Sequence, residues 1–128
     1  MQLSSALDPT NVQIDNIAGF FEDGWCNRYL SFDISAIRGV AACEFSFWLV
    51  PQEGVESARF MLSIGDARPF RFTVPLGAVT RVQSACAIGA NTCAKLVLVS
   101  DHLFPAPGDQ RELSFIVTHF DLLEAPVG

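Results

Sequence analysis

The sequence predicts an all-β fold, an antiparallel β-sandwich of jelly-roll type with eight or nine strands. The first observation is that short segments of alternating apolar and polar residues recur along the chain, with turn-forming residues between them about every 8–12 positions. The second is that no segment keeps a helical period for longer than about ten residues. The third is the composition, because 50% hydrophobic residues and 11 phenylalanines supply a large core.

The length predicts one domain. A chain of 128 residues suits a single β-sandwich and is short for two domains. A domain near this size buries roughly 70% of the surface that its unfolded chain exposes, and a charged fraction of only 17% argues against disorder. We therefore predict a single domain over residues 1–128, with a loose lead-in at 1–11 and a tail at 125–128.

The first two predicted strands differ in how clearly they alternate. Residues 12–17 alternate weakly, which favours an edge strand. A turn follows at Glu22-Asp23-Gly24, between aromatic residues. Residues 29–34 alternate cleanly and predict a half-buried strand, whose core-facing residues are Leu30, Phe32 and Ile34.

The middle of the chain repeats this pattern three times. Strands are predicted at 43–50, 59–64 and 70–74, with turns at 51–54 and 65–67. Each strand places apolar residues at alternate positions, so one face is buried. The predicted core-facing residues are Cys43, Phe45, Phe47, Leu49, Phe60, Leu62, Ile64, Phe70, Phe72 and Val74.

The C-terminal third combines a polar loop with a well-buried strand. A shorter strand at 79–84 and a run of β-branched and leucine residues at 94–99 precede the loop at 101–111. Residues 112–120 then carry apolar residues on both faces, which is typical of a strand inside a sheet. Small β domains present binding groups on loops that such strands hold in place.

The charge and the N-terminus exclude several classes of protein. The net charge is −6, so nucleic acid and anionic membrane surfaces are not expected partners. The first residues lack the basic start and apolar core of a signal peptide. No apolar run approaches the roughly 18 residues that a membrane-spanning helix needs. We expect a soluble chain located in the cytoplasm.

The four cysteines are expected to be buried, reduced thiols in a chain without a secretion signal. Cys86 and Cys93 flank a turn-like segment, so a disulfide across a hairpin is the alternative for that pair. A zinc site is not predicted, because structural zinc usually needs cysteine pairs two to four residues apart. The remaining cysteines are Cys26 and Cys43.

No catalytic signature emerges, and neither a cofactor nor a metal is predicted. Ser100, Asp101 and His102 are adjacent, but nothing resembles the Gly-x-Ser-x-Gly turn that exposes a serine nucleophile. Loop carboxylates would suit glycoside cleavage at the right separation, or calcium, although the spacing is unlike that of an EF-hand. These carboxylates are Glu22, Asp23, Asp101, Asp109 and Glu112.

Two tryptophans, two arginines and one aspartate, Asp109, are the candidate ligand-binding residues. An exposed Trp25 or Trp48 would stack on a sugar ring, while arginine and aspartate bond its hydroxyls. In the alternative, Trp48 faces a second layer or a loop, and Trp25 plugs the end of the sandwich. Arg28 and Arg111 each lie near acid-containing turns, so they could instead clamp loops through carboxylates.

Two blocks of the chain carry a family resemblance. One is Gly19-Phe20-Phe21-Glu22-Asp23-Gly24-Trp25-Cys26-Asn27-Arg28 with the strand after it, and the other is Phe104-Pro105-Ala106-Pro107-Gly108-Asp109-Gln110-Arg111-Glu112-Leu113-Ser114-Phe115. Together they resemble a β-sandwich domain attached to bacterial glycosyltransferases and other cell-surface polysaccharide biosynthesis enzymes. The resemblance covers about residues 17–124, and it implies a non-catalytic carbohydrate-binding or accessory module.

The first functional hypothesis is therefore a non-catalytic carbohydrate-binding module linked to bacterial polysaccharide synthesis. Its expected partners are a glycan or polysaccharide and a glycosyltransferase domain. One alternative is a protein-interaction domain that docks an enzyme or forms a homodimer through a sheet face. A second alternative is a small glycan-active hydrolase with loop carboxylates. The predicted ligand contacts are Trp25, Arg28, Trp48, Asp109 and Arg111.

Overall fold

The computed structural model is an all-β fold, as the sequence predicts. It describes residues 12–21, 23–36, 39–66, 68–89, 91–104, 108 and 112–124. Every strand pair is antiparallel. The strands are β1 (Val12–Phe20), β2 (Trp25–Ala36), β3 (Val40–Trp48), β4 (Ser57–Ile64), β5 (Phe70–Pro75), β6 (Thr80–Ile88), β7 (Thr92–Ser100) and β8 (Phe115–Glu124).

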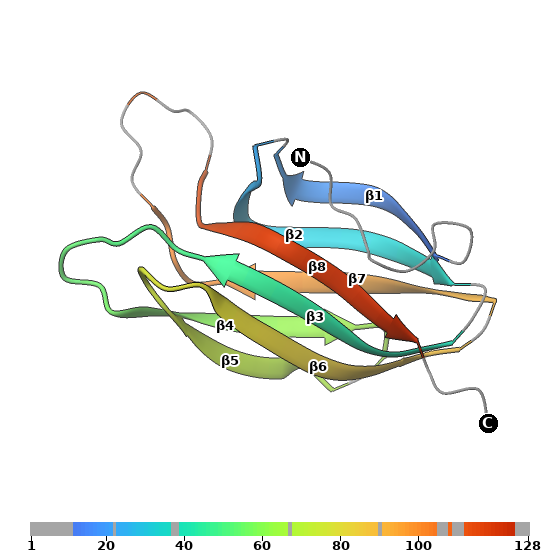
Figure 1. Cartoon of the computed structure of the whole chain (residues 1–128). Helices are drawn as coiled ribbons and strands as arrows, with labels where there is room; N and C mark the ends of the chain where they lie inside the picture. The colour runs from blue at the N-terminus through green and yellow to red at the C-terminus, as the bar shows by residue number, and fades with distance from the viewer. Residues whose placement is uncertain are drawn as a thin grey trace.

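The strands form two layers that share β2. The hydrogen-bonded order is β5-β4-β7-β2-β8-β3-β6, with β1 beside β2. Only Trp25 and Cys26 of β2 pair with β8, whereas residues 29–36 pair with β7. One layer, sheet I, is therefore β1-β2-β7-β4-β5, and the other, sheet II, is β8-β3-β6 with the start of β2 (Figure 1). This nearly closed arrangement confirms the predicted sandwich.

The positions of two strands confirm the sequence analysis. β1 pairs only with β2 among the described strands, so it is an edge strand. β8 lies between β2 and β3, inside the sheet, as its apolar pattern predicts. It starts at Phe115, because Leu113 instead forms an isolated bridge with Phe104 at the base of the loop.

The core lies between the two layers and is dominated by phenylalanines. Alternate residues of each strand point inward, and Phe32, Phe45, Phe47 and Phe115 are among the fully buried side chains. Phe47 lies at the centre of the cluster, with ring centroids 5.2–6.0 Å from four others. These four rings belong to Phe45, Phe60, Phe72 and Phe115.

The chain connections gather at the two ends of the sandwich. Successive strands run in opposite directions, so β1, β3, β5 and β7 end, and β2, β4, β6 and β8 begin, at the same end of the sandwich (Figure 1). We call this the loop end. A backbone hydrogen bond joins two connections at this end, since the amide of Gly77 donates to the carbonyl oxygen of Leu49 at 2.9 Å. The described residues at the base of the predicted functional loop, 101–104 and 112–114, therefore lie at the same end as residues 49–56 and 76–79.

The cysteines are only partly as predicted. Cys26 and Cys43 are buried, whereas Cys93 is an exposed, free thiol and so does not bond to Cys86. β6 pairs with β3, and β7 pairs with β2 and β4, so the two strands belong to different layers. The turn between them therefore connects the layers instead of closing a hairpin.

Candidate functional site

The base of the loop between β7 and β8 is held by contacts to β2. The indole of Trp25 stacks on the ring of Phe104, with centroids 5.4 Å apart and an interplanar angle of 23°. The guanidinium of Arg28 pairs with the carboxylate of Glu112, at 2.6 Å from Nη2 and 2.8 Å from Nε. Both contacts join residues far apart in the sequence. Both are contacts of the kind that the alternatives stated above describe for Arg28 and Trp25.

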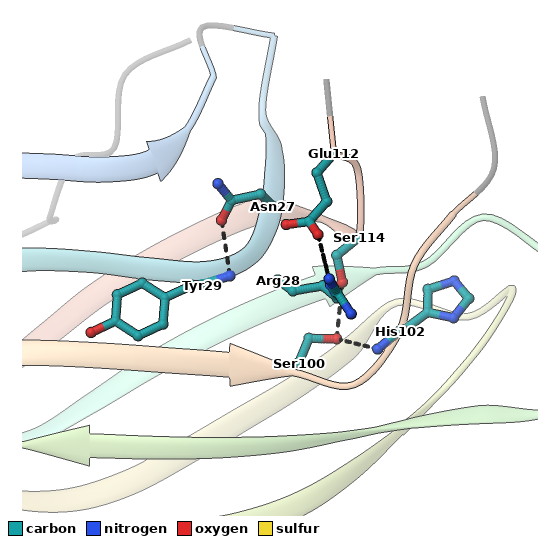
Figure 2. A network of polar contacts seen from close by, with 7 residues as sticks. All are labelled: Asn27, Arg28, Tyr29, Ser100, His102, Glu112 and Ser114. Atoms are coloured by element: carbon teal, nitrogen blue, oxygen red, sulfur yellow. Dashed lines mark hydrogen bonds and ion pairs between the residues drawn. The ribbon is translucent and has the colours of Figure 1, made fainter. Parts of the chain in front are cut away.

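A buried polar network continues from this base into β7. The hydroxyl of Ser100 accepts hydrogen bonds from the Ser114 hydroxyl at 2.9 Å and from the backbone amide of His102 at 3.0 Å (Figure 2). The imidazole of His102 points away from Ser100, and its Nε2 is buried without a hydrogen-bond partner among the described residues. His102 is therefore not placed to activate the Ser100 hydroxyl as a base. The network fixes the path of the chain.

Burial sets the charge state of His102. The residue is 6% exposed, and desolvation lowers the pKa of its imidazole below the ordinary 6.5, although the charge of Asp101 acts in the opposite direction. The neutral form is therefore the one that the fold accommodates.

We expect the free energy of unfolding to fall as the pH drops below about 6.5. Over the interval between the lowered folded pKa and 6.5, the unfolded chain binds more protons at His102 than the folded chain does, so acid favours unfolding. Urea unfolding at pH 7.5, 6.5 and 5.5 measures this loss, and His102→Phe should reduce it. Equal losses in both proteins would show that His102 does not cause the pH dependence.

Three of the five candidate loop carboxylates lie in the described residues, and each holds a neighbouring group. Glu112 pairs with Arg28, Asp101 pairs with Arg59, and the Asp23 carboxylate accepts the Trp25 amide at 3.2 Å. Glu22 and Asp109 lie outside the described residues. Within the described part of the chain, no group of three or more His, Cys, Asp or Glu side chains could hold a metal ion.

The outer face of sheet II carries an apolar row followed by charged residues. Trp25 and Trp48 are both in register with Ile116 of β8, so the three side chains share one face across neighbouring strands. Both tryptophans are half-buried. Farther along β3, Glu44 is nearly buried, with a side chain 9% exposed and Oε1 2.6 Å from the Nε of Arg81.

A groove of about 400 Å³ lies on sheet I at the loop end. It spans β4, β5 and the end of β7, and its lining includes none of the predicted ligand contacts that the structure describes. The outward side chains of these strands form two registered rows, Asp101–Arg59–Thr73 and Val99–Met61–Arg71. Its lining comprises Arg59, Phe60, Met61, Arg71, Phe72, Thr73, Val99, Ser100 and Asp101.

Tyr29 extends the second row onto the next strand. It is in register with Val99, and Val99 is in register with Met61, so the row crosses four strands from β2 to β5. With strands about 4.8 Å apart, the row is about 14 Å long. Tyr29 is 51% exposed, and its side chain lies beside β2 and β7 (Figure 2).

The structure places only part of the predicted site. Arg28 and Trp25 lie at the loop end, Trp48 lies across Ile116 from Trp25, and Asp109 and Arg111 lie outside the described residues. Ligand contacts at these five positions therefore stay predictions. The groove residues carried a weaker signal, because Arg59, Met61, Arg71 and Thr73 occupy the outward positions of alternating strands.

Burial also sets the charge state of Cys26 at this end. Desolvation raises the pKa of the Cys26 thiol to about 12, with the nearby Asp23 charge acting in the same direction and a backbone hydrogen bond from Val117 opposing it. The thiol therefore stays protonated and is a poor nucleophile.

No helix in the described part of the chain is long and apolar enough to cross a membrane.

Two solved structures are distantly similar to this chain. No protein-family model and no curated protein match the chain. It is similar to a ruminal GH26 endo-β-1,4-mannanase, with 13% identity and a TM-score of 0.49 over 85% of this chain, and it spans only 21% of the mannanase. It is also similar to TmCBM61, solved in complex with β-1,4-galactotriose, with 12% identity, a TM-score of 0.45, and 92% and 85% of the two chains covered. Such TM-scores and identities assign neither a family nor a ligand to this chain.

Proposed function

We propose that this chain is a non-catalytic carbohydrate-binding module whose ligand lies across the outer face of sheet I. The observation that carries the proposal is the groove at the loop end together with the exposed Tyr29 in the same row. Aromatic rings bind the apolar faces of sugars, and a few polar side chains bond the hydroxyls. Tyr29 supplies the ring, and Arg59, Thr73 and Asp101 supply polar groups.

The rigidity of this face supports the same function. The floor of the groove consists of paired strands. The buried hydrogen bond between Ser100 and Ser114 holds the end of β7, directly before Asp101. Preformed sites lose less entropy on binding than flexible loops do. The row of about 14 Å is long enough for an oligosaccharide rather than a single sugar.

The association with bacterial cell-surface polysaccharide synthesis rests on the sequence resemblance of residues 19–28 and 104–115. We propose on that basis that the module brings a glycosyltransferase or a related enzyme to its polysaccharide. The cytoplasmic location remains a prediction from the sequence.

A glycan-array experiment with three variants tests the binding function and its location. Tyr29→Ala should weaken glycan binding about 5- to 30-fold, since stacking on an exposed ring contributes about 1–2 kcal/mol. Trp48→Ala on sheet II should retain binding, and Val79→Ala, at an exposed apolar residue before β6, controls for surface truncation. Circular dichroism and thermal unfolding establish that each variant is folded.

The pattern of losses separates the hypotheses. Loss in folded Trp48→Ala but not in Tyr29→Ala would move the site to sheet II and contradict the groove. If the wild-type protein binds no bacterial glycan, the carbohydrate function fails, and docking to a protein partner becomes the better explanation.

A further inference from the structure

The groove on sheet I has a positive charge that contrasts with the rest of the chain. Its lining contains two arginines, Arg59 and Arg71, against one carboxylate, Asp101. The whole chain has a net charge of −6. An excess of positive charge in the groove of an acidic protein favours an anionic ligand at that place.

Asp101 offsets only the charge of Arg59, because its carboxylate is paired with that residue. Its Oδ1 accepts the backbone amide of Arg59 at 2.8 Å, and its Oδ2 lies 3.3 Å from the Nε of the same residue. The amide of Asp101 in turn donates to the carbonyl of Arg59 at 3.0 Å. These contacts fix the carboxylate against β4, and they pair its charge with that of the Arg59 guanidinium.

Arg71 supplies the remaining charge. It lies on the edge strand β5, in register with Met61, and its residue is exposed. The ion pairs among the described residues do not include it. A guanidinium is always charged at neutral pH, and its planar set of donors matches a carboxylate or phosphate in a two-bond geometry.

Building on the proposed carbohydrate function, we propose that the groove binds an acidic glycan, whose sugars carry carboxylate or phosphate groups. Arg71 binds the anionic group, and Tyr29 stacks on another sugar of the same chain. The two residues stand at opposite ends of the row of about 14 Å, so they contact different sugar units. Met61 and Val99 form the apolar floor between them.

Paired ligands and paired variants test this inference. The ligands are polyuronate oligomers of several linkages, the same oligomers with their carboxyl groups reduced to alcohols, and phosphate-bearing glycans. The proteins are the wild type, Arg71→Gln, Arg71→Lys and Arg68→Gln, where Arg68 is an exposed arginine outside the groove lining that controls for the change of net charge. Isothermal titration calorimetry at two salt concentrations measures affinity.

We expect the wild type to bind an acidic form about tenfold more tightly than its neutral counterpart, with a preference that weakens at high salt. Arg71→Gln should abolish the preference, Arg71→Lys should keep part of it, and Arg68→Gln should keep it whole. Preference for the uronates identifies a carboxylate, and preference for the phosphate-bearing glycans identifies a phosphate. Either result supports the inference.

Two results would overturn it, and they differ from failure of the carbohydrate function. Equal binding of acidic and neutral forms would leave a carbohydrate-binding module without charge selectivity. A preference that persists in Arg71→Gln would place the anion elsewhere. Absence of binding to every acidic and neutral glycan would overturn the carbohydrate function itself.

Discussion

Phe47→Ala is expected to lower the free energy of unfolding by about 3–5 kcal/mol, a large part of the total stability of a domain. Phe47 is fully buried on β3 and stacks or packs edge-on against rings from β4, β5 and β8. These strands belong to both layers, so the ring joins the sheets at the centre of the core. The deleted ring leaves a cavity that surrounding phenylalanines fill only in part.

Urea unfolding measures this effect, with Phe47→Leu as a variant that remains folded if the alanine does not. Phe47→Leu should cost about 1–2 kcal/mol, because it removes fewer buried carbons. The matched control is Phe70→Ala on the edge strand β5, where the side chain is 41% exposed and stacks on Phe72 at 5.5 Å. Phe70→Ala should cost less than half as much as Phe47→Ala. Equal costs at the two positions would contradict a core centred on Phe47.

The sequence was sufficient to predict the layers of this fold but not the way β2 joins them. The alternation of apolar and polar residues identified the side chains that point inward at 29–34, 43–50 and 59–64, because each strand has one buried face. The switch of β2 from β8 to β7 depends on pairings with residues about 70–90 positions away, such as Cys26 with Phe115 and Tyr29 with Val99. A local pattern carries no information about such partners.

The lack of local information about strand partners also explains why the sequence did not predict the groove. Single residue types drew attention to Trp25 and Arg28, whose partners in the fold, Phe104 and Glu112, are distant in sequence. The groove residues are ordinary outward positions on separate strands. Only the register of β4 with β5 and β7 brings Arg59, Arg71 and Asp101 together. A site made from rows across a sheet becomes visible when the register is known.

Gly19→Ala is expected to destabilise the fold by about 3 kcal/mol or more, because two separate costs add at this residue. Its φ of +82° lies in the left-handed region, which costs a residue with a side chain about 1–2 kcal/mol. A Cβ would also lie 2.0 Å from the carbonyl oxygen of Tyr29 and 2.6 Å from the Oδ1 of Asn27. Neither atom can move freely, since that Oδ1 accepts the Tyr29 amide at 2.9 Å where β2 changes partners (Figure 2).

Gly54→Ala separates the two costs. Gly54 has a similar φ of +80°, but nothing lies within 4 Å of the added Cβ, so only the backbone cost applies. At about 4 °C per kcal/mol for a domain of this size, Gly19→Ala should lower the Tm by roughly 12 °C or more and Gly54→Ala by roughly 4–8 °C. Similar shifts would show that the contact with Tyr29 relaxes without cost. Because that contact displaces the backbone of Tyr29, folded Gly19→Ala should also bind glycan more weakly, whereas Gly54→Ala should bind as the wild type does.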